Sequence, residues 1–184
     1  MRFPTKQDSL QRLKPLGIKT VIDVGVERCT ESLMIAFPGA KHILVESDGK
    51  WFDGYLETYK DISFEDYNWF ANSTDRRIDS IDCDGPVLLK IDVDGPELDV
   101  LRGCIGLFPK VAAIVIEATT DKLPEILLLI ERHGFRLFDI VDLCYCGPQL
   151  HQVDLVFVHS SVESKIRVDW DLALFQDSSL TVVR

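Results

Sequence analysis

Short apolar runs alternate along this chain with segments in which apolar residues recur at helical spacing. The β-branched and apolar runs predict strands at 20–24, 41–45, 87–93, 111–116, 136–141 and 153–158. The helical stripes, together with glycine and proline signals, predict helices at 9–16, 30–37, 50–59, 96–102 and 123–133. The aromatic-rich segment 63–71 is less regular, and we expect one further strand within it, followed by a turn at 72–75.

This alternation predicts an α/β fold, with a mostly parallel central sheet and helices on both faces, as in Rossmann-like domains. We expect a single domain over residues 1–184, with a core from about 10 to 158 and a polar tail at 160–184. Ligands of such sheets bind beyond the carboxyl ends of the strands. Four predicted strands end in or beside a carboxylate, which indicates a site there: Asp23, Glu46, Asp92 and Glu117.

Composition narrows the class of partner. The net charge is -10 and the lysines and arginines form no stripe, so a nucleic-acid surface is not expected. No apolar run approaches the ~20 residues of a membrane span, and no signal segment is recognisable, so we expect a cytoplasmic protein. The odd cysteine count, 5, indicates reduced thiols. Neither Cys144 and Cys146 nor the histidines have zinc-site spacing, and we predict no metal.

The first predicted turn distinguishes between two cofactors. Gly25 follows a strand that ends in Asp23-Val24, and Glu46 lies about 20 residues further on, where an acid can bind ribose hydroxyls. NAD requires further glycines in this turn and a helix start that accepts a pyrophosphate. Here those glycines are absent, and Glu27 and Glu31 would repel phosphate. The turn therefore favours S-adenosylmethionine (SAM), which is cationic, and disfavours the alternative of a nucleotide-dependent oxidoreductase.

Several stretches of the chain resemble FkbM-type methyltransferases. The most specific is Leu89-Lys90-Ile91-Asp92-Val93-Asp94-Gly95-Pro96-Glu97-Leu98-Asp99-Val100-Leu101-Arg102-Gly103. The resemblance runs from about Leu10 to Val158. Supporting stretches follow the family's order: Val21-Ile22-Asp23-Val24-Gly25, Phe37-Pro38-Gly39-Ala40, Val45-Glu46, Ile78-Asp79-Ser80-Ile81, Val115-Ile116-Glu117, Phe138-Asp139-Ile140-Val141-Asp142-Leu143 and Val153-Asp154-Leu155-Val156-Phe157-Val158.

The resemblance implies a class I methyltransferase that moves the methyl group of SAM to a hydroxyl of a sugar or a natural-product-type acceptor. It implies that Asp23 and Gly25 line the aminoacid end of SAM and that Glu46 binds its ribose. Ser73 would lie near the adenine, and Asp92 near the methyl group and the acceptor.

An alcohol acceptor benefits from a general base. Asp92 is the first candidate, followed by Asp94, Glu97 and Glu117, whereas His133 and His151 are weaker candidates. Each also has a structural interpretation. Asp94 could shape the turn, Glu97 could favour the positive end of a helix, and Asp92 could serve as a structural hydrogen-bonding group.

Two features depart from the family pattern. Cys29 replaces a small residue or glycine, and Val26-Glu27 replaces an Ala-Asn pair. A hairpin insertion that the family carries between Asp75 and Ile78 is missing. The shorter middle region is compatible with an open pocket for a large acceptor, or with a homo-oligomer or another protein that supplies the wall at the aromatic segment 51–70. The alternative function is a catalytically degenerate binding or scaffold protein.

Overall fold

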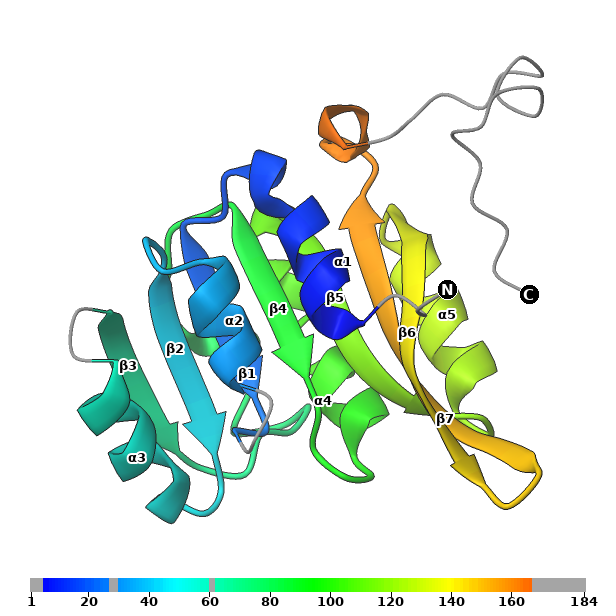
Figure 1. The fold of residues 1–184 in the computed structure, drawn as a ribbon, viewed down its shortest axis with the longest axis horizontal. Coiled ribbons are helices and arrows are strands. Elements are labelled where there is room, and N and C mark those ends of the chain that lie inside the picture. The colour runs from blue at the N-terminus through cyan, green and yellow to red at the C-terminus, as the bar shows by residue number, and fades with distance from the viewer. Residues whose placement is uncertain (1–4, 27–29, 60–61, 167–184) are drawn as a thin grey trace.

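The computed structural model describes residues 5–26, 30–59 and 62–166, and within these residues a 7-stranded sheet has the strand order β3-β2-β1-β4-β5-β7-β6 (Figure 1). The strands are β1 Thr20–Val24, β2 Lys41–Glu46, β3 Ser63–Asn68, β4 Val87–Ile91, β5 Val111–Thr119, β6 Phe135–Cys146 and β7 Gln149–His159. The helices are α1 Lys6–Arg12, α2 Thr30–Ala36, α3 Lys50–Thr58, α4 Glu97–Arg102 and α5 Leu123–Arg132, with short 3₁₀ turns η1 Lys14–Leu16, η2 Ile78–Ser80, η3 Ile105–Lys110 and η4 Glu163–Lys165.

The sheet is parallel from β3 to β5, and β7 runs antiparallel between β5 and β6. This arrangement confirms the predicted α/β class and the mostly parallel sheet. The point at which the strand order reverses lies between β1 and β4, because β2 and β3 continue on one side and β5 on the other. Such a switch point leaves a crevice beyond the carboxyl ends of the strands.

Helices cover both faces of the sheet (Figure 1). On one face, α1 and α2 bury apolar side chains against alternate residues of the central strands, such as Val21, Leu88 and Val115. On this face α3 packs beside α2 through Phe52, which contacts a small cluster with Met34 and Leu44. Because strand side chains alternate between faces, the next residue of each strand contributes to the core on the opposite face.

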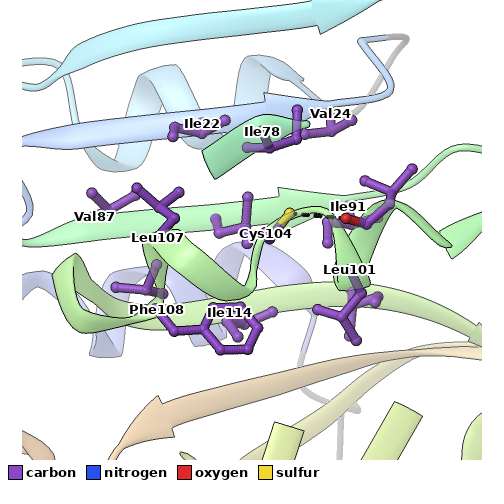
Figure 2. Packing of buried hydrophobic residues seen from close by; sticks show 14 of the residues in the cluster. Ile22, Val24, Ile78, Val87, Ile91, Leu101, Cys104, Leu107, Phe108 and Ile114 are labelled. Atoms are coloured by element: carbon purple, nitrogen blue, oxygen red, sulfur yellow. Dashed lines mark hydrogen bonds between the residues drawn. The ribbon is translucent and has the colours of Figure 1, made fainter. Parts of the chain in front are cut away.

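The opposite face holds the largest core cluster, in which α4, α5 and the 3₁₀ turns η2 and η3 cover β1, β4 and β5. Figure 2 shows Leu107 beside Val87 and Phe108 beside Ile114, with Cys104 between Ile78 and Leu101. The Cys104 thiol donates a hydrogen bond of 3.1 Å to the Val100 carbonyl, drawn as a dashed line. Burial raises the pKa of this thiol well above its usual range, so it acts as a core residue.

The N-terminal helix begins earlier than the apolar pattern predicts, at Lys6 instead of Ser9. Thr5 and Asp8 form a capping box, in which the Thr5 side chain accepts from the Asp8 backbone N–H and the Asp8 carboxylate accepts from Thr5 N. Gly17 ends the following turn in the left-handed conformation, as expected. The extra turn brings Lys6 toward the carboxyl ends of the strands.

Several predicted strand boundaries are wrong. The strand predicted at 87–93 already ends at Ile91. The fifth strand, β5, continues past Glu117 to Thr119, and the predicted strands at 136–141 and 153–158 are parts of a longer hairpin. Residues near the tip of that hairpin are mostly exposed, so no buried pattern marked them as strand. The hairpin matters for the site because the extended β7 places Gln152 and Asp154 beside the end of β5.

Candidate functional site

A cavity of about 440 Å³ lies at the carboxyl ends of β1, β2 and β4. Its volume falls in the range of ~300–1,000 Å³ that is usual for small-molecule sites. Carboxylates and aromatic rings dominate its wall, and the lining residues are Val24, Gly25, Val45, Glu46, Ser47, Trp51, Trp69, Phe70, Ala71, Asp92, Val93, Asp94, Pro96, Val100 and Glu117. The predicted switch-point crevice therefore exists, and most of the predicted site residues lie in it.

Gly25 brings the turn after β1 against the backbone that follows β4. Its φ is +88°, and a Cβ built on it would lie 1.6 Å from the carbonyl oxygen of Asp92. No side chain fits in that space, so only glycine allows this approach. The sequence predicted Gly25 as a point of close approach to a ligand, and the structure shows that it is also a point of close approach between two strand ends.

Asp23 is completely buried and does not line the cavity, which differs from its expected place at the aminoacid end of SAM. Its carboxylate accepts a hydrogen bond of 2.5 Å from Thr30 Oγ1 and one of 2.9 Å from Lys90 Nζ. Lys90 is equally buried and also donates to the Gly25 carbonyl at 2.9 Å. Asp23 lies one residue before the end of β1 and holds the following turn through Lys90, which bridges it to the Gly25 carbonyl.

Glu46 is the last residue of β2, and its carboxylate lines the cavity. Oε2 accepts from the Val26 backbone N–H at 3.0 Å, and Oε1 accepts from Asp48 N and Ser47 Oγ at 2.9 Å each. These bonds hold the carboxylate in one orientation. A carboxylate has about four acceptor positions, so Glu46 retains capacity for a ligand hydroxyl.

A row of carboxylates crosses the sheet where β4 and β5 end. Glu117 lies directly opposite Asp154 in the antiparallel pair β5–β7, and Asp92 follows Ile91, whose partner in β5 is Ile116. Alternation along the strands places Glu117 and Asp154 on the face covered by α1, because Val115 and Val156 pack into that cluster. Gln152 Nε2 donates to Glu117 Oε2 at 2.7 Å and so orients its side chain.

The environment of Glu117 disfavours its charge. Burial is the main cause, and together with the neighbouring carboxylates of Asp92, Asp154, Asp94 and Glu97 it raises the pKa of Glu117 to about 7. A carboxyl group with a pKa near neutrality, positioned in a cavity, is suited to accept and release a proton. Glu117, one of the sequence candidates for a base, combines this pKa with a place in the cavity wall.

Asp94 and Glu97 occupy different positions in the turn between β4 and α4. Asp94 is exposed at the mouth of the cavity and has a φ of +52°. Glu97 is 1% exposed and does not line the cavity. Its carboxylate accepts from the Gly95 backbone N–H and forms an ion pair with Lys122 at 3.4 Å. Glu97 thus makes structural contacts with the turn and with Lys122 instead of facing the cavity.

Ser73 lies outside the cavity wall, because its hydroxyl donates to Asp99 Oδ1 at 2.5 Å. Trp69, Phe70 and Ala71, which follow β3, line the cavity instead, and so does Trp51 of α3. Sequence reasoning noticed this aromatic segment only as a surface that a partner could cover. The signal that could have identified it is the position of residues 69–71 at the end of β3, since the ends of β1, β2 and β4 were already taken as the site.

The remaining candidates lie elsewhere or outside the described residues. His133 follows the last residue of α5 and makes an edge-to-face contact with Phe108, with ring centroids 5.2 Å apart, and His151 is exposed on β7. Neither histidine lines the cavity. Glu27 and Cys29, the atypical positions of the turn, lie outside the described residues. Among the described residues, no three His, Cys, Asp or Glu side chains gather as metal ligands would, and no helix is long and apolar enough to cross a membrane.

The charges of the wall suit a cation. Four carboxylates line the cavity, and no lysine or arginine is among its described lining residues. A phosphate-bearing ligand such as NAD would meet like charge there, whereas a sulfonium and an ammonium group would be stabilised. The aromatic side chains offer flat apolar surface for a base. The residues present therefore fit SAM.

Comparison with known families confirms the resemblance seen in the sequence over part of the chain. Residues 53–137 match the model of the methyltransferase FkbM domain. This segment contains β3, β4 and β5 and carries Asp92, Asp94 and Glu117, whereas Asp23, Gly25 and Glu46 lie before it. No curated protein matches the sequence. The family match, on the observed fold, supports a SAM-dependent methyltransferase with SAM as the cofactor.

Solved structures of methyltransferases share the fold at low sequence identity. A precorrin-6y C5,15-methyltransferase from Geobacter metallireducens aligns with a TM-score of 0.57 and 15% identity, over 86% of this chain and 90% of that one. An rRNA methylase from Streptococcus thermophilus gives 0.62 and 9%, over 86% and 98%. A protein described as a tRNA (m1A22) methyltransferase from Streptococcus pneumoniae, in complex with S-adenosyl-L-methionine, gives 0.52 and 13%, over 95% and 78%. These likenesses show a class I, Rossmann-like methyltransferase fold.

Proposed function

We propose that this chain, which carries a segment of the FkbM methyltransferase domain, is a SAM-dependent O-methyltransferase acting on a hydroxyl of a sugar or natural-product-type small molecule. The observation that carries the proposal is the acidic cavity at the strand ends. Glu46, Asp92, Asp94 and Glu117 face a space of about 440 Å³ that no described basic side chain lines. Such a wall favours a ligand with positive charge at its reacting centre.

The part of the cavity at the ends of β2 and β3 suits the nucleoside of SAM. Glu46 already has a fixed orientation from three hydrogen bonds, so it can accept from ribose hydroxyls at little further cost in side-chain entropy. Trp51 and Trp69 offer aromatic surface to the adenine. Gly25 would approach the aminoacid end, while Asp23 and Ser73 support this part of the site from behind the wall.

SAM supplies a methyl group that its sulfonium activates. The chain has to hold the acceptor oxygen in line with that group and remove its proton. We assign the removal of this proton to Glu117, because with a pKa of about 7 a substantial fraction of the molecules carry Glu117 in its ionised form at neutral pH. Gln152 holds one carboxylate oxygen of Glu117, which leaves the other for the acceptor. Asp92 and Asp94 flank the same space and would orient the acceptor hydroxyl.

The class of acceptor follows from charge and from the mouth of the cavity. A net charge of -10 disfavours a nucleic acid. In the described residues between Asn72 and Ile78, a turn leads directly into η2 with no hairpin between them. The side of the cavity next to this turn carries Phe70, which is 59% exposed. An exposed aromatic ring at a cavity mouth suits the apolar face of a sugar or a polyketide-like ring.

Isothermal titration of the folded protein with SAM and with S-adenosylhomocysteine tests the proposal. We expect micromolar binding, with SAM at least as tight as the uncharged thioether, because the acidic wall interacts with the sulfonium. Methyl transfer would then be assayed against a panel of sugars and hydroxylated aromatic compounds. Glu117→Gln should abolish transfer while SAM still binds, and Glu125→Gln, on an exposed residue of α5, is the matched control. Absence of SAM binding by a cooperatively folded chain would contradict the proposal and favour a binding or scaffold protein.

A further inference from the structure

Lys6 is a buried cation that the N-terminal helix brings to the carboxylate row. Its side chain is 10% exposed, and its Nζ lies 2.5 Å from Asp154 Oδ2. The same nitrogen lies 3.8 Å from Asp142 Oδ2 and 3.9 Å from Asp92 Oδ2. The backbone N–H of Lys6 also donates to Asp142 Oδ1 at 3.3 Å. One lysine therefore contacts carboxylates that belong to β6, to β7 and to the end of β4.

The contact with Asp154 has a consequence for Glu117. Asp154 is 5% exposed and lies directly opposite Glu117 in the β5–β7 pair, on the same face of the sheet. Opposite residues of an antiparallel pair have Cβ atoms about 4.5–5.5 Å apart, so their charges interact strongly. With Asp154 buried and Glu117 half-buried, ionisation of both carboxylates at this distance is strongly disfavoured unless a cation compensates one of them. Lys6 is within ion-pair distance of the one that faces away from the cavity.

The other charged groups around this pair come from every neighbouring element. Asp92, Asp94 and Glu97 act on Glu117 from the segment after β4 and from α4. Asp92 and Asp142 act on Asp154, whose pKa burial raises while the Lys6 ammonium opposes that rise. Lys90 lies 3.5 Å from Asp92, but it is also bound to Asp23. Among the described residues that these contacts connect, Lys6 is thus the cation that meets Asp154.

We propose that Lys6 is a positioning residue of the reaction: it holds Asp154 as an anion beside Glu117, and so determines how many protons the carboxylate row retains near neutral pH. The role in catalysis rests on the proposed function, in which Glu117 takes the acceptor proton. The electrostatic role does not depend on it. The N-terminal helix thereby becomes part of the active site, although it contributes no residue to the cavity wall.

The test is a titration of the side-chain carboxyl groups of Glu117 and Asp154 by ¹³C NMR, with signals assigned from Glu117→Gln and Asp154→Asn. Because the two groups titrate together, the observed steps belong to the pair. Removing the cation in Lys6→Met makes the pair bind protons more tightly, and we expect its two steps together to move up by about 1 pH unit or more. Lys6→Arg should restore the wild-type steps. Lys14→Met, at an exposed lysine of the same N-terminal segment, should leave them unchanged.

An Asp154→Asn background separates this role from a structural one and remains usable if Lys6→Met alone fails to fold. Asp154→Asn should lower the pKa of Glu117, because a negatively charged neighbour is lost. Adding Lys6→Met should then change Glu117 little, since the lysine acts through Asp154. The proposal would be overturned if Lys6→Met shifted the pKa of Glu117 equally in the wild-type and the Asp154→Asn backgrounds. It would also be overturned if folded Lys6→Met showed no shift of the pair's titration steps. SAM titration of the wild type is run in parallel, so that failure of cofactor binding is recognised independently of the NMR result.

Discussion

Asp23 and Glu117 are carboxylates on the same face of the same sheet, two strands apart, and their surroundings differ sharply. Asp23 is fully buried between Lys90 and Thr30, which satisfy both of its oxygens. Glu117 faces the cavity, receives one hydrogen bond from Gln152 and has four carboxylates acting on it. The buried pair is compensated within the protein, whereas the row around Glu117 has more negative charge than nearby lysines can match.

This difference shows how one fold assigns two roles to similar residues. A compensated carboxylate contributes to structure, because it fixes the β1 turn through Lys90 and the Gly25 carbonyl. An uncompensated one keeps a high proton affinity and attracts a cationic ligand. Substitutions of these carboxylates and of their partners test this contrast.

The largest effect is expected for the buried pair. Lys90→Met leaves Asp23 with an uncompensated charge in the core, and we expect it to lower the free energy of unfolding by ~3–5 kcal/mol. Urea denaturation followed by circular dichroism measures this. The double variant Asp23→Leu/Lys90→Met removes both charges and should recover much of the loss. A loss of less than ~1 kcal/mol in Lys90→Met would show that the pair contributes little to structure.

Gly25 links the two regions, and its substitution should be the next most damaging. Gly25→Ala places a Cβ against the Asp92 carbonyl oxygen at a φ of +88°, and we expect a loss of more than about 2 kcal/mol in the free energy of unfolding. Thermal and urea unfolding provide the measurement. Gly39→Ala is the matched control, since nothing lies within 4 Å of its Cβ, and it should change stability by less than ~1 kcal/mol. Equal behaviour of the two variants would argue against the close approach.

Glu46 should affect binding without affecting the fold. Glu46→Gln keeps the shape but removes the charge, and hydrogen bonds to charged groups are worth about 1.5–3 kcal/mol. We therefore expect SAM to bind on the order of 10-fold more weakly or worse, as measured by isothermal titration, with little change in the melting temperature. Asp48→Asn is a suitable comparison, because Asp48 is exposed and contacts Glu46 only through its backbone N–H. Unchanged affinity in Glu46→Gln would remove Glu46 from the cofactor site.

The smallest effect is a pH dependence of stability caused by Glu117. Its pKa is about 7 in the folded protein and near 4.5 in a model carboxyl group, so the folded state binds more protons between these values. Stability from this group is therefore complete below about pH 4.5 and is lost as the pH rises to about 7. Because Glu117 is only half-buried, we expect no more than ~1–2 kcal/mol.

Urea unfolding at pH 5 and pH 8 isolates this contribution. The free energy of unfolding of Glu117→Gln minus that of the wild type should be larger at pH 8 than at pH 5. Glu125→Gln, at an exposed position of α5 outside the cavity wall, is the control and should show no such difference. Parallel pH profiles for wild type and Glu117→Gln would place the ionisation of Glu117 near that of an ordinary carboxyl group.

The fold was largely predictable from the sequence because its central strands are buried on both faces. Thr20–Val24 is predicted and observed with the same boundaries, and every residue in it is buried. The hairpin of β6 and β7 was predicted only where it packs against the core. Its tip has exposed residues such as Tyr145, so the pattern of burial that identifies a strand is absent there.

The site was predictable in position and less so in its members. Glu46, Asp92 and Glu117 line the cavity because carboxyl ends of neighbouring parallel strands must converge. Asp23 does not line the cavity, because β1 continues for one more residue and the Asp23 side chain pairs with Lys90. The neighbours of Glu117 could not be foreseen either. Asp154 comes from a strand whose antiparallel register depends on the whole hairpin, and Lys6 comes from a helix start that no apolar repeat marks.

The hairpin also provides a practical route for labelling the molecule. Gly147 and Pro148 form a two-residue loop between Cys146 and Gln149, and a Cβ on Gly147 would meet nothing within 4 Å. Such loop tips accept inserted peptides more readily than the elements they join. Along β7 the same strand leads from this tip to Gln152 and Asp154. A fluorophore or affinity tag inserted at the tip would therefore be attached directly to the strand that flanks the proposed base, at residues that do not line the cavity.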